Sequence, residues 1–159
     1  WFSDTWQGIQ GKLQDINNGD RERSAAFPFK LAYRLINMFS VKNDTVLDPF
    51  LGTGTTMKAA ICSQRNSIGI ELSENFSGII ENEIKNSKDF CNKYIEKRFK
   101  NHLTYINNRL ESGKEVKHRL KNHDVPCISY QESKILINSI LSIEENSKIF
   151  RINYEKLID

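Results

Sequence analysis

The residues best suited to chemistry in this chain lie in the segment DPFLGTGTT, at positions 48–56. Gly52 and Gly54 carry no side chain, so a ligand can approach the backbone closely at both positions. The residues that follow favour a helix, and the first N–H groups of a helix are free and lie at the positive end of its dipole. The segment is therefore suited to hold a polar or anionic ligand through its backbone.

Two common nucleotide-binding patterns fit this glycine turn poorly. A phosphate-binding P-loop needs GxxxxGK[ST], and no lysine stands at the required place after these glycines. A dinucleotide fingerprint needs a third glycine at position 57, which is Met57 here. Asp48, just before the turn, has two interpretations, because an aspartate before proline either contacts a ligand or caps the turn itself.

Glu71 is the acidic residue that could complete such a site. It lies in the apolar segment 67–72, which follows the glycine turn and its helix. In a βαβ unit its carboxylate would lie beside the turn, at the carboxyl edge of the sheet, and could accept both ribose hydroxyls of an adenosine group. The alternative is a surface glutamate at the end of a strand.

Hydrophobic periodicity predicts the elements that position these residues. Apolar residues at helical spacing after Pro28 predict a helix that ends near Phe39. A short buried strand over 45–47 follows, then the glycine turn, a helix from about Met57, and a second strand over 67–72. This order predicts a βαβ unit with parallel strands.

The rest of the chain, residues 83–159, is predicted to be a mainly helical extension. Apolar residues recur at helical spacing from Phe76 to Leu110, which predicts one long amphipathic helix or two in series. We expect short strands over 125–130 and 150–154, with a helix over 132–143 between them.

The extension is also basic. The segment 83–123 holds eleven Lys and Arg residues against five Asp and Glu, a net charge of +6, while the whole chain carries only +3. A segment with this charge suits contact with nucleic-acid phosphates, although a solvated helix face has the same composition.

Three motifs together resemble the DNA amino-methyltransferases of restriction–modification systems: AAFPFKLAYRLINMFS (25–40), VLDPFLGTGTT (46–56) and SIGIEL (67–72). The resemblance covers about residues 1–82. It implies an α/β fold, with 1–82 as the S-adenosylmethionine-binding segment of a Rossmann-like methyltransferase sheet. It also implies the cofactor-binding residues, namely Phe27, Pro28, Asp48, Phe50, Gly52, Gly54, Thr55, Thr56 and Glu71.

The catalytic motif of that family is missing from this chain. The motif is Asp, Asn or Ser followed by Pro-Pro and an aromatic residue, whereas the prolines here are Pro28, Pro49 and Pro126. The resemblance implies that the motif holds the exocyclic amine of a base rotated out of the duplex, and that it precedes the cofactor motifs. Because the chain starts at Trp1, we expect this segment to lie N-terminal to residue 1 and the chain alone to be inactive.

The resulting hypothesis is the cofactor-binding part of a site-specific DNA methyltransferase. It would transfer a methyl group from S-adenosylmethionine to N6 of adenine or N4 of cytosine, by direct attack of the amine in which positioning supplies much of the rate. Its expected partners are double-stranded DNA and the catalytic half or a second subunit. Two alternatives remain open: a non-catalytic remnant or split subunit, and an RNA or small-molecule methyltransferase with the same cofactor unit.

Composition narrows the class of protein. Hydrophobic residues make up 38% and charged residues 27% of the 159 residues, which fits one globular domain with an appendage. No apolar run approaches the roughly 20 residues that span a bilayer, and the N-terminus lacks the features of a signal peptide. We therefore expect a cytoplasmic protein. Cys62, Cys91 and Cys127 have no metal-ligand spacing, so we expect reduced structural thiols and no metal.

Overall fold

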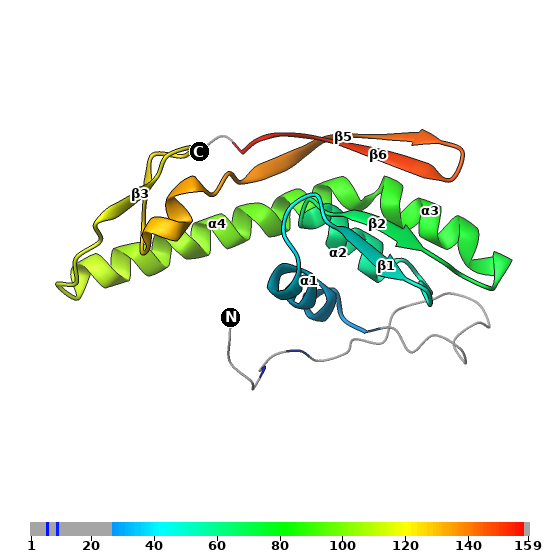
Figure 1. Ribbon diagram of the computed structural model, residues 1–159, viewed down its shortest axis with the longest axis horizontal. Helices are drawn as coiled ribbons and strands as arrows, with labels where there is room; N and C mark the ends of the chain where they lie inside the picture. The colour runs from blue at the N-terminus through cyan, green and yellow to red at the C-terminus, as the bar shows by residue number, and fades with distance from the viewer. Residues whose placement is uncertain (1–5, 7–8, 10–26, 158–159) are drawn as a thin grey trace. The chain divides into compact units, whose positions relative to one another are not determined.

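The computed structural model describes Trp6, Ile9 and residues 27–157, whose helices and strands are drawn in Figure 1. The chain divides into two compact units. The first unit comprises Trp1–Ser87 and Glu145–Phe150, and the second comprises Lys88–Glu144 and Arg151–Asp159. Helices and strands occur in both, so the predicted α/β composition is confirmed.

The first unit is built from α1 (Phe29–Phe39), β1 (Thr45–Asp48), α2 (Thr55–Cys62), β2 (Asn66–Gly69), the 3-10 turn η2 (Glu74–Phe76) and α3 (Ser77–Lys85). The elements that follow are α4 (Ser87–Glu111), β3 (His118–Leu120), β4 (Val125–Cys127), the 3-10 turn η3 (Tyr130–Lys134), β5 (Asn138–Asn146) and β6 (Ile149–Lys156).

The predicted βαβ unit is present in the first unit. Strands β1 and β2 pair in parallel, with Thr45 opposite Asn66 and Asp48 opposite Gly69, and α2 connects them. Among the described residues this sheet has only these two strands. The wider Rossmann-like sheet therefore stays a prediction.

Helix α1 packs against α2 through small and apolar side chains. Ala32, Tyr33 and Ile36 form the buried face of α1, and α2 offers Ala59 and Ala60, which have no exposed surface. Alanine side chains let two helices approach closely, which suits dense packing in the core.

Polar side chains fasten the ends of these helices to one another. The side-chain amide of Asn37 donates to Ser63 Oγ at 3.0 Å. The guanidinium of Arg65 donates to Ser40 Oγ at 3.0 Å and to the Ser40 carbonyl at 2.6 Å. The C-terminal ends of α1 and α2 are therefore joined, directly before β2 begins.

The second unit is organised along α4. Cys91, Ile95, Phe99 and Ile106 recur at helical spacing and are buried. The side chain of Asn92 holds β5, because its amide donates to the Ile140 carbonyl at 3.0 Å and its oxygen accepts the Ile140 N–H at 2.7 Å. This pair of bonds ties the backbone of β5 at Ile140 to α4.

The prediction of a mainly helical extension is wrong, because four strands follow α4. The predicted helix over 132–143 is replaced by η3 and by β5, which starts at Asn138. Isoleucine occurs there at spacings of three, which imitates a helix, yet its β-branched side chain favours extended backbone. Residues 147 and 148 then join β5 to β6, which supplies the pairing partner. The strand predicted over 150–154 is confirmed within β6, and the one over 125–130 extends only to Cys127.

Candidate functional site

The glycine turn lies between the end of β1 and the start of α2. Gly52 and Gly54 have φ angles of 55° and 89°, in the left-handed region that favours glycine. Gly54 is the N-cap of α2, and its N–H donates to the Leu51 carbonyl at 3.1 Å. The turn thus places the free N–H groups of the first turn of α2 at the carboxyl end of β1.

Glu71 holds this turn through its carboxylate. Oε2 accepts the backbone N–H of Gly52 at 2.8 Å, and Oε1 accepts the N–H of Ser73 at 2.9 Å. Hydrogen bonds to a charged carboxylate are stronger than those between neutral groups. A carboxylate has about four acceptor positions, so these two bonds leave both oxygens able to accept a further donor, such as a ligand hydroxyl.

Leu51 and Gly69 support the turn, and the sequence reasoning did not single out either. The backbone pairing of β1 and β2 continues past Gly69, because the Leu51 N–H donates to the Ile70 carbonyl at 2.9 Å. A Cβ atom at Gly69 would lie 2.5 Å from Leu51 Cδ2. The buried Leu51 side chain therefore packs directly on the backbone of β2. A glycine inside a strand is the signal of such a close approach.

Asp48 caps the turn, which is one of the two interpretations that the sequence allows for this residue. Its Oδ1 accepts the N–H of Phe50 at 3.0 Å, which is the local bond expected of an aspartate at this kind of turn. The Phe50 side chain is exposed, whereas Thr55 and Thr56 are half-buried in the first turn of α2.

Phe27 and Pro28 stand at the start of α1. Pro28 is the N-cap of that helix, and Phe27 just before it is exposed. The hydrogen bond from Asn37 to Ser63 joins the C-terminal ends of α1 and α2, away from this start of α1. The predicted site residues therefore come from two places, the glycine turn with Glu71 and the N-terminal end of α1.

One face of the two-stranded sheet is apolar and exposed. Leu47 and Ile68 lie opposite one another in the register, and both are more than half exposed, as are Ile70 and Leu72 further along. Parallel sheets in α/β proteins are normally covered on both faces. The described part of the chain leaves this face bare.

Neither a membrane helix nor a metal cluster is found in the described ranges. No helix there is both long and apolar enough to cross a bilayer. No group of three or more His, Cys, Asp or Glu residues is arranged there to hold a metal ion.

A family model described as DNA methylase matches residues 1–82, which is more than half of the chain. The chain belongs to the DNA methylase family. The matched segment contains β1, the glycine turn, α2, β2 and Glu71. The predicted likeness to amino-methyltransferases of restriction–modification systems is thereby confirmed.

Curated relatives of this DNA methylase chain include several Type II methyltransferases. M.MthZI of Methanothermobacter thermautotrophicus is 50% identical over 115 residues, which are 72% of this chain and 32% of the relative. M.MjaI of Methanocaldococcus jannaschii is 54% identical over 84 residues, or 53% of this chain and 27% of the relative. M.BglI of Bacillus subtilis is 36% identical over 146 residues, or 92% and 34%. The chain thus spans about a third of the length of these relatives.

A solved structure, the DNA modification methylase TTHA0409 of Thermus thermophilus in complex with S-adenosyl-L-methionine, is 43% identical to the DNA methylase chain. The overlap covers 38% of this chain and 26% of that one, with a TM-score of 0.38. An overlap of this size is too small to define the fold of the whole chain.

Proposed function

We propose that the chain is the cofactor-binding part of a site-specific DNA methyltransferase that acts on the exocyclic amine of adenine or cytosine. The observation that best supports this proposal is the hydrogen bond that the Gly52 N–H donates to the Glu71 carboxylate, at the carboxyl ends of two parallel strands. Ligands of open α/β sheets bind at this edge. Membership of the DNA methylase family over residues 1–82 supports the same conclusion.

The residues of the turn suit S-adenosylmethionine. A Cβ atom at Gly52 would meet no atom within 4 Å, so there is open space beside the backbone. Glu71 keeps acceptor positions for two ribose hydroxyls. Asp48, Phe50, Gly54, Thr55 and Thr56 form the rest of the proposed binding loop, while Phe27 and Pro28 would help to hold the methionine end. The bound cofactor supplies an electrophilic methyl group, and these residues orient it.

We further propose that the catalytic motif belongs to a separate segment that completes the enzyme. The chain contains no Pro-Pro pair and spans about a third of its relatives. Among the described residues, nothing covers the apolar face around Leu47 and Ile68, whereas parallel sheets are normally covered on both faces. A segment with the Asp/Asn/Ser-Pro-Pro-aromatic motif, together with further strands of a Rossmann-like sheet, is the occupant we propose for this face.

Isothermal titration of S-adenosylmethionine into the chain tests the cofactor site. We expect binding, and we expect Gly54→Asp to abolish it, because the carboxylate would enter the turn and the left-handed backbone disfavours any side chain. Glu74→Gln, an exposed change in η2, is the matched control and should bind like the unchanged chain. A folded chain that binds neither S-adenosylmethionine nor S-adenosylhomocysteine would overturn the proposal.

Methyl transfer to duplex DNA tests the completion of the enzyme. The chain alone should transfer no methyl group, and addition of a polypeptide with the catalytic motif should restore transfer. Ile68→Asp should weaken this restoration, since it places a charge on the face proposed to be covered. Activity of the chain alone would contradict its incompleteness. Cofactor binding without transfer in any mixture would instead favour a non-catalytic remnant.

A further inference from the structure

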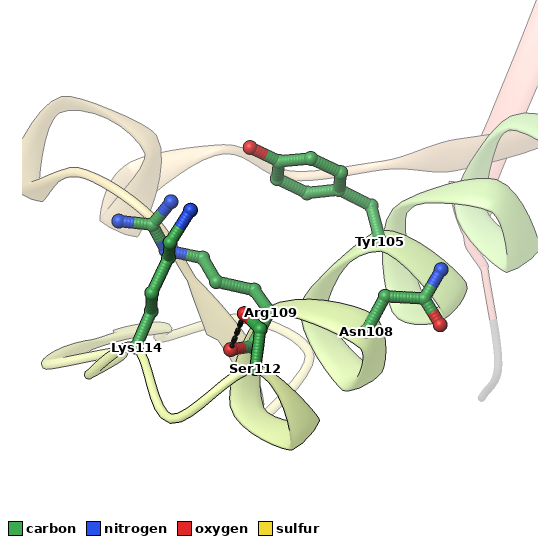
Figure 2. Close-up of a pocket in the computed structure, with 5 residues that line it drawn as sticks. All are labelled: Tyr105, Asn108, Arg109, Ser112 and Lys114. Atoms are coloured by element: carbon green, nitrogen blue, oxygen red, sulfur yellow. Dashed lines mark hydrogen bonds between the residues drawn. The ribbon is translucent and has the colours of Figure 1, made fainter.

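A shallow hollow near the C-terminal end of α4 is lined by five residues whose side chains each carry a hydrogen-bond donor (Figure 2). Its volume is about 190 Å³, and its lining residues are Tyr105, Asn108, Arg109, Ser112 and Lys114. All of them lie in the second unit. Tyr105 and Arg109 are four positions apart on α4, which places them on one face of the helix, and Ser112 follows directly after its end.

The two cations of the hollow have no partner among the described residues. No ion pair or side-chain hydrogen bond of that part of the chain involves the Arg109 guanidinium or the Lys114 ammonium. The Arg109 Nε is buried and lacks an acceptor. Buried donors without acceptors are unfavourable, and two cations that line the same hollow repel each other. An anion in the hollow would relieve both effects.

The neighbouring polar groups fit the same kind of ligand. Ser112 Oγ donates to the Arg109 carbonyl at 2.7 Å, so this hydroxyl stabilises the last turn of the helix. Figure 2 shows the Tyr105 hydroxyl on the same side as the Arg109 guanidinium and the Lys114 ammonium, whereas the Asn108 amide points away from them. Arginine, lysine and tyrosine side chains all bind the phosphates of nucleic acids.

The size of the hollow indicates a single group of a larger molecule. Sites that enclose a small-molecule ligand usually measure roughly 300–1,000 Å³, and this one is smaller. The surrounding segment 83–123 carries a net charge of +6, which attracts a polyanion. We propose that Tyr105, Arg109 and Lys114 bind one backbone phosphate of double-stranded DNA. The choice of DNA rests on the proposed function.

Fluorescence anisotropy of a labelled DNA duplex with the full chain, over a range of salt concentrations, tests this site. The double variant Arg109→Gln/Lys114→Gln should bind about tenfold more weakly, and its slope of log K against log salt should fall by about 1, the value for one phosphate contact. The matched control Lys148→Gln/Arg151→Gln removes the same charge from exposed positions of the β5–β6 hairpin. It should leave the slope nearly unchanged.

Tyr105→Phe provides a second test that leaves the charge unchanged. It removes one hydroxyl from an exposed side chain, so the fold should be kept while duplex affinity falls by a factor of about 2–5, the effect of one hydrogen bond. Equal behaviour of the two double variants, or no binding of the duplex by the unchanged chain, would overturn the proposal. Tighter binding of a duplex RNA of the same sequence would overturn the assignment to DNA.

Cofactor titration of the same proteins separates this site from the proposed function. The double variant at Arg109 and Lys114 should bind S-adenosylmethionine like the unchanged chain, because the glycine turn lies in the other unit. A chain that binds cofactor, but whose duplex affinity ignores this double variant, contradicts the phosphate site alone. A chain that uses the hollow for DNA yet never binds cofactor contradicts the proposed function instead.

Discussion

Replacement of Glu71 by glutamine should loosen the glycine turn as well as the proposed cofactor site. The carboxylate accepts one backbone N–H on each oxygen, from Gly52 at 2.8 Å and from Ser73 at 2.9 Å. Glutamine has one acceptor oxygen and one NH₂ group. Glu71→Gln therefore keeps one of these bonds in neutral form and turns an NH₂ group toward the other N–H.

The magnitude follows from the two bonds. A hydrogen bond to a charged group contributes about 1.5–3 kcal/mol, and a neutral one about 0.5–1.5 kcal/mol. Glu71 is half-buried, so water can replace part of the lost bond. We expect a local destabilisation of about 2 kcal/mol, which corresponds to a factor of roughly 30 in the opening equilibrium of the turn.

Amide hydrogen exchange measures this effect residue by residue. The amides of Gly52 and Ser73 should exchange roughly 30 times faster in Glu71→Gln. The Lys58 amide, which donates to the Gly54 carbonyl at 3.0 Å inside α2, serves as the internal control and should change less. Under the proposed function, the cofactor affinity of the variant should fall as well, since the ribose would lose a charged acceptor.

Two outcomes would refute this reasoning. Unchanged exchange at Gly52 and Ser73 would show that the carboxylate does not hold the turn. An equal effect in the control Glu74→Gln, whose side chain is exposed, would show that loss of negative charge near the turn is sufficient and that the geometry of Glu71 is irrelevant.

Three further predictions concern packing, the helix ends and a buried thiol. Gly69→Ala should lower the free energy of unfolding in urea by about 1–3 kcal/mol, because its Cβ would clash with Leu51, whereas Gly78→Ala in open space within α3 should raise it by about 0.5–1 kcal/mol. Arg65→Lys should cost about 1–3 kcal/mol in the same assay, because one ammonium cannot replace the guanidinium fork; a loss below about 0.5 kcal/mol would contradict this. Burial, and next the charge of Glu132, raise the pKa of the Cys127 thiol above 9.0. The folded state therefore favours the protonated thiol, and its stability should fall as the pH rises through 9.0 and beyond. Thermal unfolding at about pH 8 and about pH 10 should show a smaller drop for Cys127→Ala than for the unchanged chain, and equal drops would contradict the assignment.

The βαβ unit could be predicted because its signals are local. Gly52 and Gly54 stand between a strand pattern and a helix pattern in the sequence. Both glycines adopt positive φ angles, which glycine adopts more readily than other residues. The order of motifs also placed Glu71 beside the turn. Its bonds to the backbone of Gly52 and Ser73 could not be predicted, because they depend on the path of the chain after β2.

The second unit was harder to predict because its contacts are long-range. The isoleucines near Ile140 fit a helical period. A strand forms there because β5 pairs with β6 and because the Asn92 side chain hydrogen-bonds to the backbone of Ile140. The hollow on α4 gave a weaker signal still. Arg109 and Lys114 counted only as part of a basic segment, because sequence does not reveal that neither has a counter-charge among the residues that the structure describes.

The bare face of β1 and β2 also determines how the protein behaves at high concentration. Each strand has one unpaired edge among the described residues. Leu47 and Ile68 add an exposed apolar surface, which favours association between molecules. The net charge of +3 provides little mutual repulsion between molecules. Sulfate strengthens apolar association, so a preparation of this chain should turn cloudy in sulfate at concentrations where chloride keeps it clear, and Ile68→Asp should remain clear in both.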